Sequence, residues 1–77
     1  MPQGTASGRI AANARAIRAR KKLLLATVVR RSGLSERKVQ RLLNTDQKWF
    51  AEDIEAMAAG LDVDWTALVA SSDEVAA

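Results

Sequence analysis

The chain has 77 residues and contains neither cysteine nor histidine, which excludes disulfide staples and the usual ligands of a structural zinc site. The same absence removes the commonest general base and the strongest side-chain nucleophile, and the four glycines form no phosphate-binding loop. We therefore expect a small folded domain that is not an enzyme and needs no cofactor. No apolar run reaches the roughly 18 residues of a membrane span, and no signal peptide is evident, so we expect a cytoplasmic protein without a membrane partner.

Basic and acidic residues are segregated along the chain. Residues 1–48 hold all twelve basic residues and two acidic ones, whereas residues 49–77 hold seven acidic residues and no basic one. The formal net charge of +3 therefore combines a part of +10 with a part of −7. A fold with this division presents one strongly positive side, and the commonest soluble polyanion that binds such a side is nucleic acid.

Turn-forming and apolar residues divide the chain into three segments. Residues 1–7 are rich in turn formers and are expected to be a flexible arm. Residues 8–70 are expected to fold as one all-α domain of five short helices, and residues 71–77 as a frayed tail.

The first helix is predicted over Gly8–Lys21. Ile10, Ala14 and Ile17 recur at spacings of four and three, which places them on one face of a helix. Ser7 is the expected N-cap.

The most apolar stretch, Leu23–Val29, is compatible by composition with a buried strand. Its continuation to Gly33 favours a short helix that ends before this glycine. Ser35 is then the expected N-cap of a third helix, with Glu36 in the first turn, where the helix dipole favours a negative charge. The inward residues of this third helix are expected to be Val39, Leu42 and Leu43.

A turn at Asn44–Gln47 precedes a fourth helix, predicted over Ala51–Ala59 with Gly60 at its C-terminal end. Its inward residues are expected to be Ile54, Met57 and Ala58. Asp64 is the expected cap of a last helix that runs from Trp65 to about Ala70.

Two aromatic residues, Trp49 and Phe50, precede the fourth helix. Either side chain is able to stack on a nucleotide, but an aromatic residue beside a helix start usually packs into the core. We expect Phe50, and by a smaller margin Trp49, to be core residues.

Residues 28–44 have the pattern of a helix-turn-helix. Gly33 provides a tight turn between two helices, and the apolar residues that lock the pair are Val28, Val29, Leu34, Val39 and Leu42. The second helix of such a motif enters the DNA major groove. Its outward side chains suit base recognition, because Arg pairs with guanine, Gln with adenine, and Glu accepts from cytosine. These candidate base-reading residues are Glu36, Arg37, Gln40 and Arg41.

From about Ile17 to Val69 the sequence resembles the phage lambda repressor and Cro-type helix-turn-helix family. Matches to the family pattern are the turn glycine Gly33, the pair Leu34-Ser35 after it, the core positions Val39 and Leu42, and the closing asparagine Asn44. The segments Ile54–Asp64 and Trp65–Leu68 are similar to the family's fourth and fifth helices. Departures are Leu25 in place of a glutamine that touches the DNA backbone, Val28-Val29 in place of Leu-Ala, and Ser32 in place of an apolar residue.

The resemblance implies a five-helix DNA-binding domain and a sequence-specific regulator of transcription. The expected partner is double-stranded DNA, and the expected action is promoter occlusion by a phage repressor of the Cro type in the cytoplasm of a bacterial host. It also implies that Asn44 binds phosphate. Other residues that flank the same face are expected to hold the DNA backbone, namely Arg30, Arg31, Ser35, Lys38 and Lys48.

Several readings stay open at this point. Arg15, Arg18 and Arg20 either contact DNA or simply lie on the solvent-exposed side of the first helix. We give these two alternatives equal weight. The apolar residues of the last helix are Trp65, Leu68 and Val69. They are either core residues or the interface of a homodimer, and we favour the interface. A symmetric dimer sets its recognition helices about 34 Å apart. The rival functions are an antitoxin-like or adaptor-like module that binds a basic protein, and a factor that bends DNA.

Overall fold

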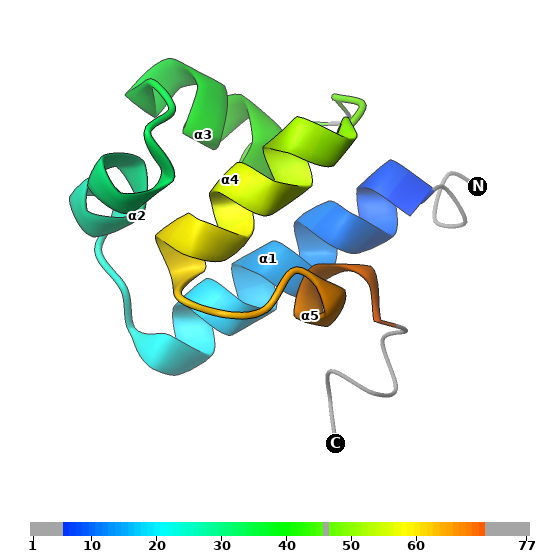
Figure 1. Cartoon of the computed structure of the whole chain (residues 1–77), viewed down its shortest axis with the longest axis horizontal. Coiled ribbons are helices and arrows are strands. Elements are labelled where there is room, and N and C mark those ends of the chain that lie inside the picture. Colours follow the sequence, from blue (N-terminus) through cyan, green and yellow to red (C-terminus); the bar gives the residue numbers. More distant parts are fainter. Residues whose placement is uncertain (1–5, 46, 71–77) are drawn as a thin grey trace.

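The structure is a computed structural model that describes residues 6–45 and 47–70. The described residues form an all-α globule, as predicted, with no strand among them. The helices are α1 (Ala6–Lys21), α2 (Leu25–Ser32), α3 (Glu36–Asn44), α4 (Ala51–Leu61) and α5 (Thr66–Val69). Figure 1 shows α1 and α4 through the middle of the molecule, α2 and α3 together at one end, and α5 beside α1. The tail predicted over 71–77, and all but the last two residues of the predicted arm, lie outside the described residues.

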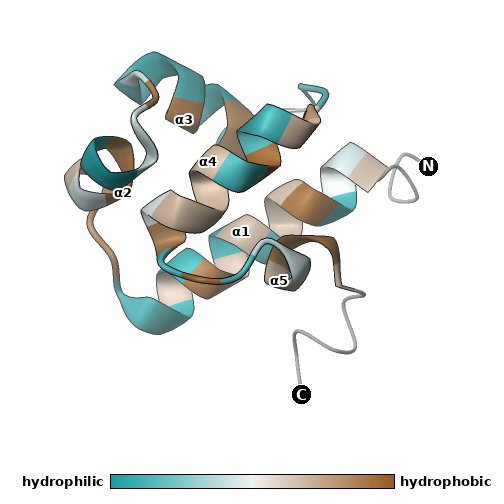
Figure 2. Ribbon diagram, in the orientation of Figure 1, coloured by the Kyte–Doolittle hydropathy of each residue, from teal (hydrophilic) through white to brown (hydrophobic). Residues whose placement is uncertain are grey.

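All five helices contribute to a single hydrophobic core. α2 packs mainly on α4, while α1 is the element that contacts α3, α4 and α5. The apolar faces turn inward between the ribbons (Figure 2). The largest fully buried side chains are Val28, Val39, Leu42, Leu43, Met57, Leu61 and Leu68.

α1 begins two residues earlier than expected and ends at the predicted Lys21. Ser7 therefore lies inside the first turn and is not the N-cap. Its hydroxyl is occupied by a distant segment, because it accepts a 2.9 Å hydrogen bond from the backbone N–H of Trp49. This bond fixes the loop between α3 and α4 to the start of α1.

α2 resolves the choice between strand and helix in favour of a helix. It ends where predicted, since Gly33 adopts a left-handed conformation with φ of 76° directly after it. Ser32 stands where an apolar residue is common, and its hydroxyl stabilises the turn. It donates to the carbonyl of Val29 and accepts from the N–H of Leu34, each at 3.1 Å.

α3 follows after the short turn Gly33–Ser35 and contacts α2. The hydroxyl of Ser35 accepts a 3.1 Å bond from the N–H of Lys38, which confirms the predicted N-cap. The three residues predicted to face inward are all buried: Val39, Leu42 and Leu43.

α4 continues to Leu61, so Gly60 lies inside the helix instead of at its end. The glycine is needed for packing. A Cβ atom at this position would lie only 2.8 Å from the carbonyl oxygen of Val28 and 3.0 Å from its Cγ1. The left-handed residue that ends the helix is Asp62, with φ of 59°.

The expectation for the two aromatic residues holds for one of them. Trp49 is buried, with 6% exposure, whereas Phe50 is 57% exposed and is not a core residue. Phe50 occupies the N-cap position of α4, where its N–H donates to Asp53 Oδ2 at 2.9 Å. In that extended conformation its ring extends away from the core that Trp49 has already filled.

α5 is a single turn that polar groups hold in place. The buried amide of Asn13 on α1 donates to the carbonyls of Leu68 and Ala70, at 2.8 and 2.7 Å. The helix begins at Thr66, one residue later than predicted, so Trp65 and not Asp64 occupies the N-cap position. The Asp64 carboxylate still accepts hydrogen bonds from both the backbone N–H and the hydroxyl of Thr66. These two bonds hold the pKa of the exposed Asp64 carboxyl below its ordinary value.

Candidate nucleic-acid interface

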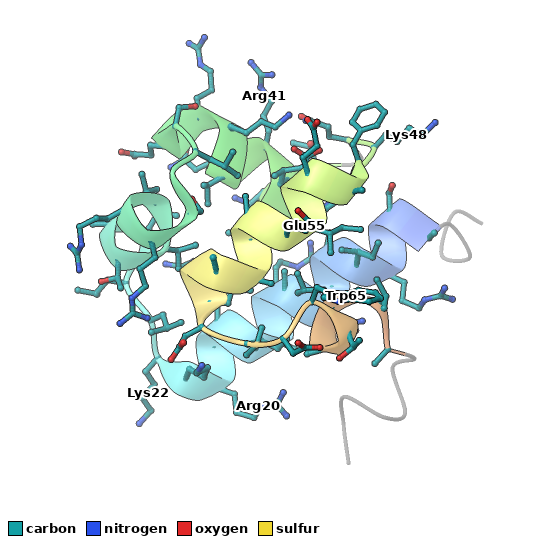
Figure 3. The ribbon with its side chains drawn as sticks, in the orientation of Figure 1. Arg20, Lys22, Arg41, Lys48, Glu55 and Trp65 are labelled. Carbon is teal, nitrogen blue, oxygen red and sulfur yellow. The ribbon has the colours of Figure 1, made fainter. Side chains whose placement is uncertain are left out.

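The exposed side of α3 carries the four residues predicted to read bases. Glu36, Arg37, Gln40 and Arg41 are all exposed, while the opposite side of the helix is buried. Figure 3 shows Arg41 extending away from the body of the molecule. Within the described part of the chain, neither Arg37 nor Arg41 has a side-chain hydrogen-bond or ion-pair partner, so both guanidinium groups are available to a ligand.

Gln40 and Glu36 are one helical turn apart and interact with each other. The Gln40 side-chain amide donates to Glu36 Oε2 at 3.5 Å. This long, exposed bond is weak, but it orients the amide along the helix surface. Glu36 thus combines the predicted first-turn position with a contact to a neighbouring polar side chain.

α3 is mounted rigidly at both ends. Ser35 caps its N-terminus, and Arg15 of α1 donates a 2.5 Å bond to the carbonyl of Leu43 in its last turn. A cation at this position also complements the negative end of the helix dipole. The backbone of a helix fixed in this way needs little further ordering when a ligand binds.

Four of the six residues predicted to contact phosphate are exposed with their polar groups available: Arg30, Arg31, Asn44 and Lys48. Lys48 Nζ lies 5.7 Å from the centroid of the exposed Phe50 ring, a cation–π arrangement. Figure 3 shows Lys48 on the same upper edge of the molecule as Arg41.

The other two predicted phosphate contacts have structural roles. The hydroxyl of Ser35 accepts the N-cap bond described above. Lys38 is half-buried, and its Nζ lies 3.6 Å from Oδ1 of the buried Asp53 of α4. The ammonium group of Lys38 thus compensates a buried carboxylate and links α3 to α4, which lowers its value as a DNA contact.

The α1 cations have roles that sequence patterns did not reveal. Besides Arg15, Arg18 Nε donates to the carbonyl of Leu23 at 3.1 Å, and Lys21 Nζ donates to the carbonyls of Leu61 and Asp62, each at 2.8 Å. The bonds of Arg15 and Lys21 join α1 to the C-terminal ends of α3 and α4, whereas the bond of Arg18 is local and fixes the segment that follows α1. Lys21 and Asp62 are 41 positions apart, so local sequence gives no signal for such a contact.

The predicted dimer-interface residues do not lie on one surface. Leu68 has no exposed area and belongs to the core, because it is packed under α5 against α1. Trp65 is 52% exposed and Val69 is 36% exposed. Only these two of the three predicted residues are accessible to a second molecule.

Acidic side chains are exposed on α4. They are Glu52 and Glu55, and Figure 3 shows Glu55 in front of the body of the molecule, away from the direction in which Arg41 extends. The exposed stripe of α3 carries Arg37 and Arg41 and one acidic residue, Glu36. No set of three potential metal-binding side chains occurs in the described ranges. No helix built from these residues has both the length and the apolar character to cross a membrane.

Comparison of this chain with protein-family models, curated proteins and solved structures found no match.

Proposed function

We propose that this chain is a sequence-specific double-stranded DNA-binding regulator of transcription, with α2 and α3 as a helix-turn-helix and α3 as its recognition helix. The observation that carries the proposal is the stripe on α3. Arg37, Gln40 and Arg41 are exposed on a helix whose other side is locked into the core. The five-helix arrangement and the tight turn at Gly33 are in keeping with a lambda repressor-like domain.

The dimensions and the chemistry of α3 both suit the major groove. With its side chains an α-helix is about 10–12 Å in diameter, and the groove is about 12 Å wide. Arg37 and Arg41 are each suited to a bidentate contact with guanine, and Gln40 to one with adenine. Glu36 restrains Gln40 and is itself able to accept from cytosine.

Residues on both sides of α3 supply the phosphate contacts in this proposal. Arg30 and Arg31 lie at the end of α2, Asn44 ends α3, and Lys48 lies in the loop before α4. All four are exposed. Contacts from several elements fix the register of the recognition helix on the duplex, whereas the α3 side chains determine which sequence is bound.

We further propose a homodimer that represses by covering a promoter, in the manner of a Cro-type phage repressor. The exposed Trp65 and Val69 are the surface available for self-association. A twofold dimer on DNA requires two half-sites about one helical turn apart, so the bound sequence is expected to be palindromic.

The test replaces the two unpaired arginines of α3. Arg37→Ala and Arg41→Ala are each expected to weaken binding to the preferred duplex by roughly 1–3 kcal/mol, about 5- to 150-fold, and to relax the preference at one base position. Arg9→Ala is the matched control, because it removes the same charge from an exposed site on α1. Titration of labelled duplex at fixed salt gives the affinities. Losses equal to that of the Arg9 variant would show that α3 does not read DNA.

A further inference from the structure

Two adjoining surface depressions lie between α1 and the C-terminal end of α3, with volumes of about 340 and 300 Å³. The first is lined by Gly8, Ala11, Arg15, Asn44 and Thr45, and the second by Arg15, Arg18, Ala19, Lys22, Leu23, Leu43 and Asn44. Because Arg15 and Asn44 line both, the two depressions are adjacent, and we call them together the α1–α3 groove. Its charged lining residues are all basic.

The α1–α3 groove continues the stripe of α3 that is proposed to read bases. Gln40 and Arg41 lie three and four residues after Arg37, and Asn44 lies four and three residues after them, so these residues share one side of the helix. Asn44 is the last of them and also lines the groove. Asn44 thus joins the exposed side of α3 to the groove, whereas Lys22, at the α1 end of the groove, extends from the edge of the molecule opposite to Arg41 (Figure 3).

The two arginines of the groove are held in position before any ligand arrives. Arg15 donates one N–H to the carbonyl of Leu43, and Arg18 donates its Nε–H to the carbonyl of Leu23. A guanidinium group has five N–H donors, so most of the donors of each side chain remain for an anion. Fixed arginines lose little side-chain entropy when they bind a phosphate.

Lys22 adds a cation at a position where glycine is the usual residue. It ends α1 in the left-handed conformation, with φ of 55°, and the N–H of Leu23 bonds to the carbonyl of Arg18 at 3.1 Å. A lysine there retains a cost of order 1 kcal/mol that glycine would avoid. Among the described residues its ammonium group has no hydrogen-bond or ion-pair partner, and Figure 3 shows it extending away from the helices.

We infer that the α1–α3 groove binds the phosphodiester backbone of the same duplex whose bases α3 reads, with Lys22, Arg18 and Arg15 as the cations and Asn44 as the polar link. This inference rests on the proposed function. The inference adds a row of phosphate contacts on α1, the phosphate track, to the contacts that the proposed function assigns to α2, α3 and the loop before α4. The track extends the interface along the DNA and makes affinity more dependent on salt.

The experiment measures the salt dependence of binding for charge-neutralised variants of α1. Lys22→Gln is expected to weaken binding about three- to tenfold at 0.1 M salt, and to reduce the slope of log affinity against log salt by about 0.9, the value for one phosphate contact. Lys22→Arg keeps the charge and should behave as the wild type. Arg20→Gln is the matched control, because Arg20 is also exposed, lies two residues away and does not line the groove.

Circular dichroism and urea denaturation establish that each variant is folded. An unchanged slope for Lys22→Gln would overturn the inference, as would equal effects of Lys22→Gln and Arg20→Gln, which would indicate general charge attraction. Shortening the duplex by single base pairs tests whether α3 and the groove bind one duplex or two separate ones. If both bind the same duplex, the affinities of Lys22→Gln and wild type should become equal once the duplex is too short to reach the groove.

The outcome is distinguishable from failure of the proposed function. If Arg37→Ala and Arg41→Ala have no effect while Lys22→Gln still lowers the slope on a random-sequence duplex, the groove binds backbone but α3 reads no bases. If the α3 variants lose specificity while Lys22→Gln does not differ from Arg20→Gln, the proposed function stands and the groove does not bind DNA. Absence of any DNA binding by the wild type overturns both.

Discussion

Gly60 determines how closely α4 packs on α2. Sequence pattern places this glycine at a helix end, the commonest position for it, yet its function is to leave space for the backbone of α2 at Val28. Periodicity cannot distinguish these roles, because both place a glycine near the end of an apolar stripe. The information lies in a contact between residues that are 32 positions apart in the chain.

Gly60→Ala is expected to destabilise the fold by up to about 2 kcal/mol, although alanine is the better helix former. The new Cβ would overlap the carbonyl of Val28 and force a backbone shift, which typically costs about 1–3 kcal/mol, against a propensity gain of about 1 kcal/mol. Ala59→Gly, at the exposed neighbouring position, reports the propensity effect alone. Urea denaturation measures both; a Gly60→Ala protein more stable than wild type would contradict the close packing.

Trp49 and Phe50 show a second limit at the scale of single residues. Both are aromatic and adjacent, so composition cannot say which of them enters the core. The choice is made by the loop backbone: Ser7 holds the N–H of Trp49, and Asp53 holds the N–H of Phe50. Once both N–H groups are fixed, successive side chains extend to opposite sides, and one aromatic ring remains in solvent.

At the scale of helices, the sequence predicts best where local chemistry decides. Both ends of α3 follow from adjacent residues, since Ser35 caps one end and the polar residues after Asn44 end the other. The end of α2 follows from Gly33 in the same way. The exposed stripe of α3 is predictable for the same reason, because burial of Val39 and Leu42 leaves Arg37 and Arg41 outside.

Prediction fails where distant elements share a residue. Lys38 was expected to face phosphate, but Asp53 of α4 is buried beside it and its negative charge requires a partner. Arg15 and Lys21 likewise bind carbonyl groups of other helices. A helical wheel shows which side of a helix a cation occupies, but not which carbonyl lies opposite.

α5 depends on one side chain of α1. Asn13→Ala removes both bonds from the buried amide to the carbonyls of Leu68 and Ala70, and is expected to cost about 1–3 kcal/mol of unfolding free energy. The loss should be concentrated in α5, so amide hydrogen exchange at Leu68 and Val69 should accelerate more than exchange in α3. Asn44→Ala is the control at an exposed asparagine. A uniform change across all helices would contradict a local role for Asn13.

At the scale of the whole molecule, the division of charge along the sequence becomes a division among helices. The basic part of the chain builds α1, α2 and α3, whereas α4 carries acidic residues and no basic one. Some of the twelve cations serve the fold itself, through bonds to carbonyl groups and to Asp53. The net charge of the basic part therefore overstates what is available to DNA, and the positions of the unpaired cations are the better guide.

The small number of exposed apolar residues near α5 limits self-association. Leu68 is buried in the core, so the exposed apolar residues of the α5 region are Trp65 and Val69. Two side chains are a small area for a stable interface, so the homodimer of the proposed function is expected to form on DNA, where two adjacent half-sites bring the chains together.

Selection from a pool of random duplex DNA at about 150 mM salt tests the central claim most directly, because non-specific affinity is weak under this condition. The proposed function predicts enrichment of one palindromic motif by the wild-type chain and loss of that enrichment for Arg37→Ala and Arg41→Ala. Enrichment of a single half-site would retain DNA reading by α3 but contradict the dimer. If no motif is enriched, α3 does not read DNA, and the chain is better explained as a module that binds a protein partner.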